Sequence, residues 1–443
     1  MTSTNKYGLF TCISMITGVV IGSGIFFKSD DILIATGGSI FLGGLAFCIA
    51  AIRIIFGCLT IAQLAAHNDK AGGVISYAEE SYSGGVACAF GWFQTFLYYP
   101  VLTVVLSFVV GIYVCLLLGI TPVLEWQLLI GLLTVFMFFI INTFSTKLAG
   151  YFQNTSAVVK MVPLFLIGIA GFIFAKPDVT VMVSPAQLKS ATWLSALTPI
   201  IFAFDGWIVA TSISHEVKNA KKNIPLALIL SPLIILAIYL LYFVGISMYL
   251  GPEVIMETQD AHVQLAAIQL LGPWAGKALF VFVTISVLGT TNGLIMGLSN
   301  MPYSLALRNM FPYSKTVALY NKKLKVPLYS YWVSLGIVLF WTVIHYVTQK
   351  FKLLPGNSDI SEIPLTLNYV LFIFLYVEVF KRGLRGEIKG FWKGKFYPIM
   401  ATIGSLILLY VGLQNTIYYL YMGVCIIFLF GAYVFWKKHT VKK

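Results

Sequence analysis

The sequence is poor in charge. Charged residues make up 10% of its 443 positions, whereas soluble domains carry about 25%. A soluble fold of this length could not cover its surface with so few charges, which excludes a soluble multidomain protein, a disordered chain, a coiled coil and a nucleic-acid-binding module. Hydrophobic residues fill 59% of the chain instead. The composition therefore predicts a polytopic protein embedded in a lipid bilayer.

Cysteine and histidine motifs are also lacking. The six cysteines lie in apolar stretches without CxxC or other paired spacing, which indicates neither a disulfide framework nor a metal site. His215-Glu216 is followed by no second histidine at helical spacing, so it is not a zinc motif. No other catalytic constellation is visible. We therefore expect a protein that is not an enzyme and that needs no metal or cofactor.

What the chain does contain is a series of long apolar segments. A helix needs about 20 mainly apolar residues to cross a bilayer. Twelve segments meet this requirement, and no linker or low-complexity tract divides them, so we expect one transmembrane domain over 1–443. The predicted spans lie near 8–28, 37–64, 86–119, 125–143, 154–175, 195–216, 226–250, 275–301, 328–347, 363–380, 397–413 and 416–437.

The basic residues predict the orientation of the chain. Most of the 29 lysines and arginines fall in the N-terminal segment, the C-terminal tail and the loops after even-numbered spans. Because basic loops stay in the cytoplasm, we expect both termini inside, and we attribute the net charge of +13 to topology rather than to an anionic ligand. Two stretches are too short to cross. Residues 71–80 should form an interfacial or re-entrant helix, and 252–273 should form short helices on the outer side.

Glycines interrupt the first span. Gly22 and Gly24 flank Ser23 in the middle of the apolar segment, and a glycine inside a helix costs about 1 kcal/mol relative to alanine. An opened helix would free backbone amides that can bind a carboxylate. Close packing between helices explains the same small residues equally well.

An acidic residue marks the sixth span. Asp205 precedes Gly206 at membrane depth, where a carboxylate must face a cavity or a partner. The first and sixth spans are five apart, which is the relationship expected of an inverted-repeat transporter. Amides of the first span would then bind a substrate carboxylate, and carbonyls of the sixth would bind its ammonium. Together these groups describe an amino acid.

Other polar residues inside spans have two interpretations each. Lys160 either extends back to the cytoplasm along its aliphatic chain or forms a fixed internal cation that bridges first-span carbonyls to the hydroxyl of Ser286. Ser286 alternatively bonds back to its own helix. Tyr242 is either a packing residue or a pocket residue. No partner is predicted for Arg53.

Four motifs resemble those of the amino acid–polyamine–organocation (APC) superfamily, and of its L-amino acid transporter branch in particular. They are 21–26 (IGSGIF), 71–77 (AGGVISY), 202–207 (FAFDGW) and 216–225 (EVKNAKKNIP). The resemblance covers the whole chain and includes bacterial serine/threonine or alanine/serine/cysteine exchangers. It implies a LeuT-type fold, with helices 1 and 6 interrupted. Helices 1–5 (1–175) and 6–10 (195–380) would be inverted repeats, and helices 11 and 12 (397–437) would be appended.

The resemblance also implies a substrate site. Lys160 matches the span-five lysine of sodium-independent members, with Ser286 beside it, which favours the internal-cation interpretation. The remaining site residues implied or weighed are Gly22, Ser23 and Gly24 for the carboxylate; carbonyls of Ile21, Phe202, Ala203 and Asp205 for the amine; Phe202 as a gate; and Phe204 and Tyr242 as candidate pocket residues.

Two features depart from the family pattern. Asp205 stands where many relatives have a small residue, which leaves open a cationic substrate side chain or a proton-linked role. The outer loop 120–125 has no cysteine, so a disulfide-linked heavy chain is not expected.

These features predict a sodium-independent exchanger of small neutral L-amino acids in the cell membrane, working by alternating access. Within transport, the alternatives are proton-coupled symport and transport of cationic amino acids or polyamines. An alternative of a different class is a receptor that binds amino acids without moving them.

Overall fold

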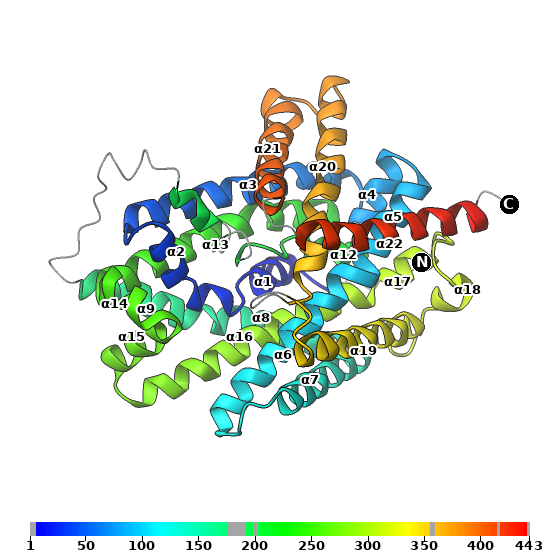
Figure 1. The fold of residues 1–443 in the computed structure, drawn as a ribbon. Helices are drawn as coiled ribbons and strands as arrows, with labels where there is room; N and C mark the ends of the chain where they lie inside the picture. The colour runs from blue at the N-terminus through cyan, green and yellow to red at the C-terminus, as the bar shows by residue number, and fades with distance from the viewer. Residues whose placement is uncertain are drawn as a thin grey trace.

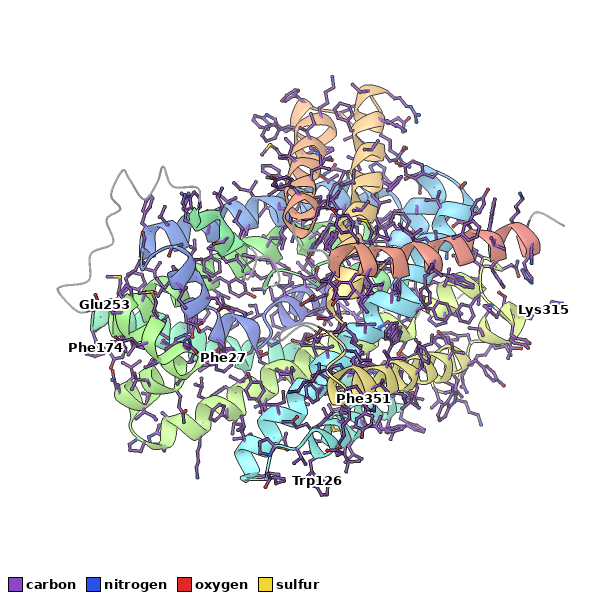
Figure 2. All side chains as sticks on the ribbon, in the orientation of Figure 1. Phe27, Trp126, Phe174, Glu253, Lys315 and Phe351 are labelled. Atoms are coloured by element: carbon purple, nitrogen blue, oxygen red, sulfur yellow. The ribbon has the colours of Figure 1, made fainter. Side chains whose placement is uncertain are left out.

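The computed structural model describes residues 6–175, 192–197, 200, 203–354, 359–413 and 417–440. In this part of the chain the regular structure is helical, apart from two isolated β-bridges. The helices pack into one bundle with the first helix near its centre (Figure 1). Large apolar side chains project from its outer surface, among them Trp126, Phe174 and Phe351 (Figure 2). Such a surface suits a bilayer, where lipid replaces water as the solvent.

Within the described ranges, ten helices are long and apolar enough to cross a membrane, by length and composition. They are α1 (Leu9–Val20) with η1 (Gly24–Phe27), α3 (Ile40–His67), α5 (Gly84–Phe93) with the π-helical turn η2 (Gln94–Tyr98) and α6 (Tyr99–Leu118), α7 (Leu124–Phe144), α8 (Thr146–Val159) with α9 (Met161–Ile173), α13 (Ala220–Leu250), α16 (Trp274–Ser299) with α17 (Met301–Ala306), α19 (Leu328–Lys350), α20 (Glu362–Leu384) and α22 (Ile417–Thr440).

Two of the twelve predicted spans are not among these ten helices. The predicted span 397–413 corresponds to α21 (Tyr397–Gly412), which has 16 residues and follows the π-helical turn η6 (Trp392–Phe396). The predicted span 195–216 is described only in part, and three short helical elements fall within or next to its described residues. These are η3 (Thr192–Ala196), α12 (Val209–Ser212) and η4 (Ser214–Glu216). The count of twelve membrane helices therefore stays a prediction.

Both stretches predicted as short helices are confirmed as such. Residues 71–80 contain most of α4 (Val74–Ser81), and 252–273 contain α14 (Pro252–Thr258), η5 (Gln259–Ala261) and α15 (His262–Leu271). The other short helices are α2 (Ser29–Ala35) and α18 (Ser314–Val317). Helices α14 and α15 lie at the end of the bundle opposite to α4, α18 and both termini (Figure 1).

The N-terminal segment is attached by polar contacts to the end of the bundle that contains α4 and α18. Nζ of Lys6 forms an ion pair with Glu216 at 2.8 Å and donates to the carbonyl oxygen of Lys325 at 2.7 Å. The next residue, Tyr7, forms a parallel β-bridge with Val217. Basic segments far apart in the sequence therefore meet at one end, as the charge pattern requires of loops on the same membrane side.

Candidate functional site

Helix α1 stops at Val20, and helical structure resumes only at Gly24. The first predicted span is therefore interrupted at Gly22-Ser23-Gly24. The flanking isoleucines are buried, whereas Gly24 is exposed and Gly22 and Ser23 are half-buried. In the described part of the chain, no backbone carbonyl accepts a hydrogen bond from the amide of Ser23 or Gly24. Unpaired amides that face open space are available to bind an anion.

The break also frees carbonyl groups at the end of α1, and a buried lysine donates hydrogen bonds to them. Nζ of Lys160 donates to the carbonyl oxygens of Gly18 and Ile21, each at 2.7 Å. The Lys160 side chain is fully buried, so it does not extend back to the membrane surface. A cation in this place is stabilised by the last carbonyls of the helix and by its macrodipole.

The eighth predicted span contacts this lysine through two groups. Lys160 donates to the carbonyl oxygen of Ser286 at 2.9 Å and to the hydroxyl oxygen of Thr290 at 3.3 Å. The Ser286 hydroxyl instead donates to the carbonyl oxygen of Ile21 at 3.2 Å. The hydroxyl beside the lysine is therefore that of Thr290, one helical turn beyond the predicted partner. Four oxygen atoms surround the ammonium, an environment that hard metal cations also favour.

A cavity of about 320 Å³ lies beside the break in α1. Its walls are formed by the interrupted part of α1, one face of α6, residues 203–206, α16 and residues 359–365. Apolar side chains make up most of these walls, and a few polar groups from different elements converge on the space. Cavities that bind small molecules have volumes of about 300 to 1,000 Å³ and this kind of lining.

Asp205 places a carboxylate on the cavity wall. Its Oδ2 accepts a hydrogen bond from the hydroxyl of Tyr98 at 2.6 Å, and its Oδ1 accepts one from Tyr369 at 2.7 Å. The following residue, Gly206, has a φ of +93°. A Cβ atom at Gly206 would lie 2.5 Å from Cγ1 of Val19. Glycine therefore allows the chain to turn close against α1 beside the carboxylate.

The carbonyls predicted to bind a substrate amine are partly occupied. The Ile21 oxygen accepts from both Lys160 and Ser286, which uses its two lone pairs. The Ala203 oxygen accepts one hydrogen bond, from the hydroxyl of Tyr239 at 2.7 Å. The Ile21 oxygen thus has two described donors, whereas the Ala203 oxygen has one among the described side chains.

Two candidate pocket residues do not line the cavity. Phe204 is fully buried and packs against Tyr239, with ring centroids 5.0 Å apart. Tyr242 is also buried, and its hydroxyl donates to the carbonyl oxygen of Phe26 at 2.9 Å. Both residues support the elements around the cavity instead of facing a ligand. Phe202, the predicted gate, lies outside the described residues.

Sequence reasoning missed Tyr98, Tyr369 and Thr290. Each carries a hydroxyl inside an apolar span. The sequence does not distinguish a hydroxyl that bonds within its own helix from one that bonds to another helix. Tyr98 ends the π-helical turn that begins at Gln94, and such a turn changes which side chains face inward. Hydroxyl-bearing residues in spans were a usable signal, although they did not indicate which residues would meet.

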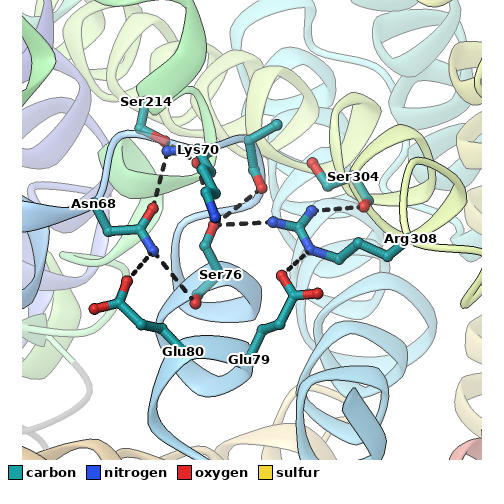
Figure 3. Close-up of polar contacts among 9 residues, drawn as sticks. Asn68, Lys70, Ser76, Glu79, Glu80, Ser214, Ser304 and Arg308 are labelled. Atoms are coloured by element: carbon teal, nitrogen blue, oxygen red, sulfur yellow. Dashed lines mark hydrogen bonds and ion pairs between the residues drawn. The ribbon is translucent and has the colours of Figure 1, made fainter. Parts of the chain in front are cut away.

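A second polar cluster lies outside the cavity, around α4 (Figure 3). Nε of Arg308 donates to Glu79 at 2.6 Å, and Nδ2 of Asn68 donates to Glu80 at 2.7 Å. Glu80 also accepts from Arg382 at 2.9 Å. Helix α4 is thus joined by charge to the segments that follow α3, α17 and the end of α20. These polar contacts add to the burial of Val74, Ile75 and Tyr77 on the other face of the helix.

One protein family and one bacterial relative match nearly the whole chain, and two human relatives match about two thirds of it. Residues 7–438 match the family described as Amino acid permease. The serine/threonine exchanger SteT of Bacillus subtilis is 25% identical over 408 residues, which cover 91% of this chain and 90% of that protein. The b(0,+)-type amino acid transporter 1 of Homo sapiens is 27% identical over 296 residues, covering 65% and 60%. The cystine/glutamate transporter of Homo sapiens is 26% identical over 316 residues, covering 69% and 62%.

Proposed function

Because the chain belongs to the amino acid permease family of the APC superfamily, we propose that it exchanges small neutral L-amino acids across the cell membrane without sodium. Family membership makes it a membrane-embedded amino acid transporter and not an enzyme. The mode of coupling, the substrate and the roles of single residues are the proposal.

The substrate carboxylate binds to the amides of Ser23 and Gly24. Both residues line the cavity, and their amides have no backbone acceptor within the described chain. The amide of Gly22 already donates to the carbonyl oxygen of Val20 at 2.9 Å, so Gly22 contributes space and conformational freedom. An anion that accepts two backbone hydrogen bonds needs no basic side chain.

The substrate ammonium binds on the other side of the cavity, at Asp205 and Ala203. Asp205 supplies a carboxylate, and Ala203 supplies its carbonyl oxygen. One observation carries this proposal: residues with unpaired backbone amides and residues with oxygen acceptors line the same cavity. Such a pairing suits a zwitterion and neither an anion nor a cation alone.

Sodium independence is proposed from the four oxygens around Lys160. The lysine supplies a covalently attached cation at the end of α1, where a transported metal cation could otherwise be needed. A fixed charge of this kind holds the break in place whatever ions are present.

Exchange and alternating access are proposed from the likeness to a bacterial exchanger. Repeats over 1–175 and 195–380 would move relative to each other around the cavity, with 397–437 appended. Both termini would face the cytoplasm, in agreement with the basic segments that meet at their end of the bundle. No disulfide-linked heavy chain is proposed, since 120–125 lacks cysteine.

One observation favours a second candidate function. The Asp205 carboxylate on the cavity wall could bind a cationic side chain or carry a transported proton.

Purified protein in liposomes distinguishes the candidates. For exchange, internal unlabelled serine should accelerate uptake of labelled serine in sodium-free buffer, and a pH gradient should have no effect. Uptake driven by a pH gradient into empty liposomes would identify symport, and binding without uptake would identify a receptor. Competition by the twenty amino acids, putrescine and agmatine would define the substrate.

A further inference from the structure

Arg53 is a second cation buried between helices, and the proposed transport function does not use it. It lies in α3, is 6% exposed, and its Nε and Nη2 atoms have no hydrogen-bond partner in the described part of the chain. A buried guanidinium is costly unless a nearby group compensates its charge. Its surroundings should therefore contain that group.

Arg53 is held between α20 and α21. Its guanidinium carbon lies 4.1 Å from the centre of the Tyr369 ring, which is a cation–π contact. Gly404 of α21 packs against its aliphatic stem, because a Cβ atom at Gly404 would lie 2.6 Å from Cγ of Arg53. These two contacts keep the positive charge at a defined place behind the cavity wall.

Tyr369 connects Arg53 to the cavity. Its hydroxyl donates to Oδ1 of Asp205 at 2.7 Å, while Tyr98 donates to Oδ2 at 2.6 Å. The positive charge therefore lies one tyrosine ring away from the negative charge on the cavity wall. In a site of low dielectric constant, charges at this separation still interact strongly.

The other charged groups nearby have partners of their own. Glu378, on the same helix as Tyr369, forms an ion pair with Arg382 at 3.1 Å. On the cavity wall, Lys28 pairs with Asp31 at 2.7 Å, and Asp359 accepts hydrogen bonds from Ser361 at the start of α20. Because Ser361 is neutral, Asp359 keeps its charge on the cavity wall. Asp205 is the carboxylate that Tyr369 joins to Arg53.

We propose that Arg53 sets the charge selectivity of the cavity by balancing Asp205, so that zwitterions with neutral side chains are accepted and those with cationic side chains are rejected. A neutral side chain adds no charge to the balanced pair. A cationic side chain brings a positive charge that the Arg53–Asp205 pair does not compensate. Arg53 acts through Tyr369 and does not touch the substrate, so it is a positioning residue. This inference rests on the proposed function.

The test is the ratio of labelled arginine uptake to labelled serine uptake in liposomes, expressed as kcat/KM for each. Arg53→Gln leaves Asp205 unbalanced, and the ratio should rise at least about tenfold. The double variant Arg53→Gln/Asp205→Asn is neutral again. Uptake of both substrates should fall, because Asp205 binds the substrate ammonium, but their ratio should return to that of the wild type. A ratio that is unchanged in Arg53→Gln would overturn the proposal.

Two controls separate selectivity from folding. Arg382→Gln removes a half-buried arginine that pairs with Glu80 and Glu378, and it should lower stability without moving the ratio. If Arg53→Gln does not fold, Arg53→Lys should keep the wild-type ratio and Tyr369→Phe should raise it; the reverse pattern would overturn the proposal. Wild-type protein that takes up no amino acid at all would instead contradict the proposed function.

Discussion

The ammonium of Lys160 lies 2.7 Å from the carbonyl oxygen of Gly18, and this contact joins two interrupted helices through one charge. Helix α8 ends at Val159 because Pro163 has no N–H to donate to the Val159 carbonyl. Helix α1 ends shortly after Gly18, where its last carbonyls need partners. The two breaks therefore complete each other: one supplies a buried cation, and the other supplies the acceptors for it.

Replacing this cation should impair transport. Lys160→Met keeps an unbranched side chain, one atom shorter, but leaves the oxygens of Gly18 and Ile21 without a charged donor, so serine uptake should fall by about tenfold or more. Expression should fall less than uptake. Lys147 lies on the same helix and is exposed, so Lys147→Met is the matched control and should transport normally. Unchanged turnover and unchanged sodium independence in Lys160→Met would refute the coupling role.

The hydroxyl of Tyr239 should matter for substrate binding. It donates to the carbonyl oxygens of Ala203 at 2.7 Å and Val20 at 3.1 Å, and so joins the ends of both interrupted segments. Tyr239→Phe should raise the KM for serine severalfold and cost about 1 kcal/mol of stability. Tyr242→Phe, one turn further along α13, loses a hydrogen bond away from the cavity and should leave KM unchanged. Equal KM values for both variants would contradict the assignment.

Gly206 should tolerate no side chain. Alanine would be strained at a φ of +93°, and its Cβ would lie 2.5 Å from Val19, so Gly206→Ala should lose about 1 to 3 kcal/mol of stability. Thermal unfolding in detergent measures this loss. Gly423 lies inside α22 and has no atom within 4 Å of an added Cβ, so Gly423→Ala should be at least as stable as the wild type. A stable Gly206→Ala protein would show that the turn beside Asp205 can relax.

The polar cluster around α4 should weaken in acid. Partial burial works against ionisation of Glu80, but hydrogen bonds from Arg382 and Asn68 lower the pKa of its carboxyl below the usual value. The lowered pKa means that the folded state favours the ionised form. The stabilisation is therefore present above the unfolded-state pKa of about 4.3 and is lost as the pH falls toward the lower folded-state value.

Thermal unfolding at a series of pH values tests this. Glu80→Gln should be less stable than the wild type at pH 7, and the difference in stability should disappear in acid. Glu253 is exposed at the opposite end of the bundle, and Glu253→Gln should match the wild type throughout. A difference between Glu80→Gln and the wild type that does not depend on pH would rule out ionisation as the cause.

The places where helices break were predictable, because the features that cause them are local. Gly22 and Gly24 weaken a helix wherever it packs, and Asp205 is costly in any apolar segment. The lysine inside the fifth span was recognisable for the same reason. The predicted partner Ser286 contacts the ammonium through its carbonyl oxygen, while the hydroxyl that reaches the ammonium is that of Thr290.

The sequence by itself identified a membrane transporter and the segments that form its cavity, through its long apolar segments and few intramembrane charges. These signals are readable because bilayer thickness and the cost of polar groups act on each segment separately. The partners of Asp205 could not be found in this way. Tyr98 and Tyr369 are 107 and 164 positions away from it along the chain, and Arg53 lies behind Tyr369. Such contacts depend on how whole helices pack and rotate, which is a property of the assembled bundle and not of any single segment.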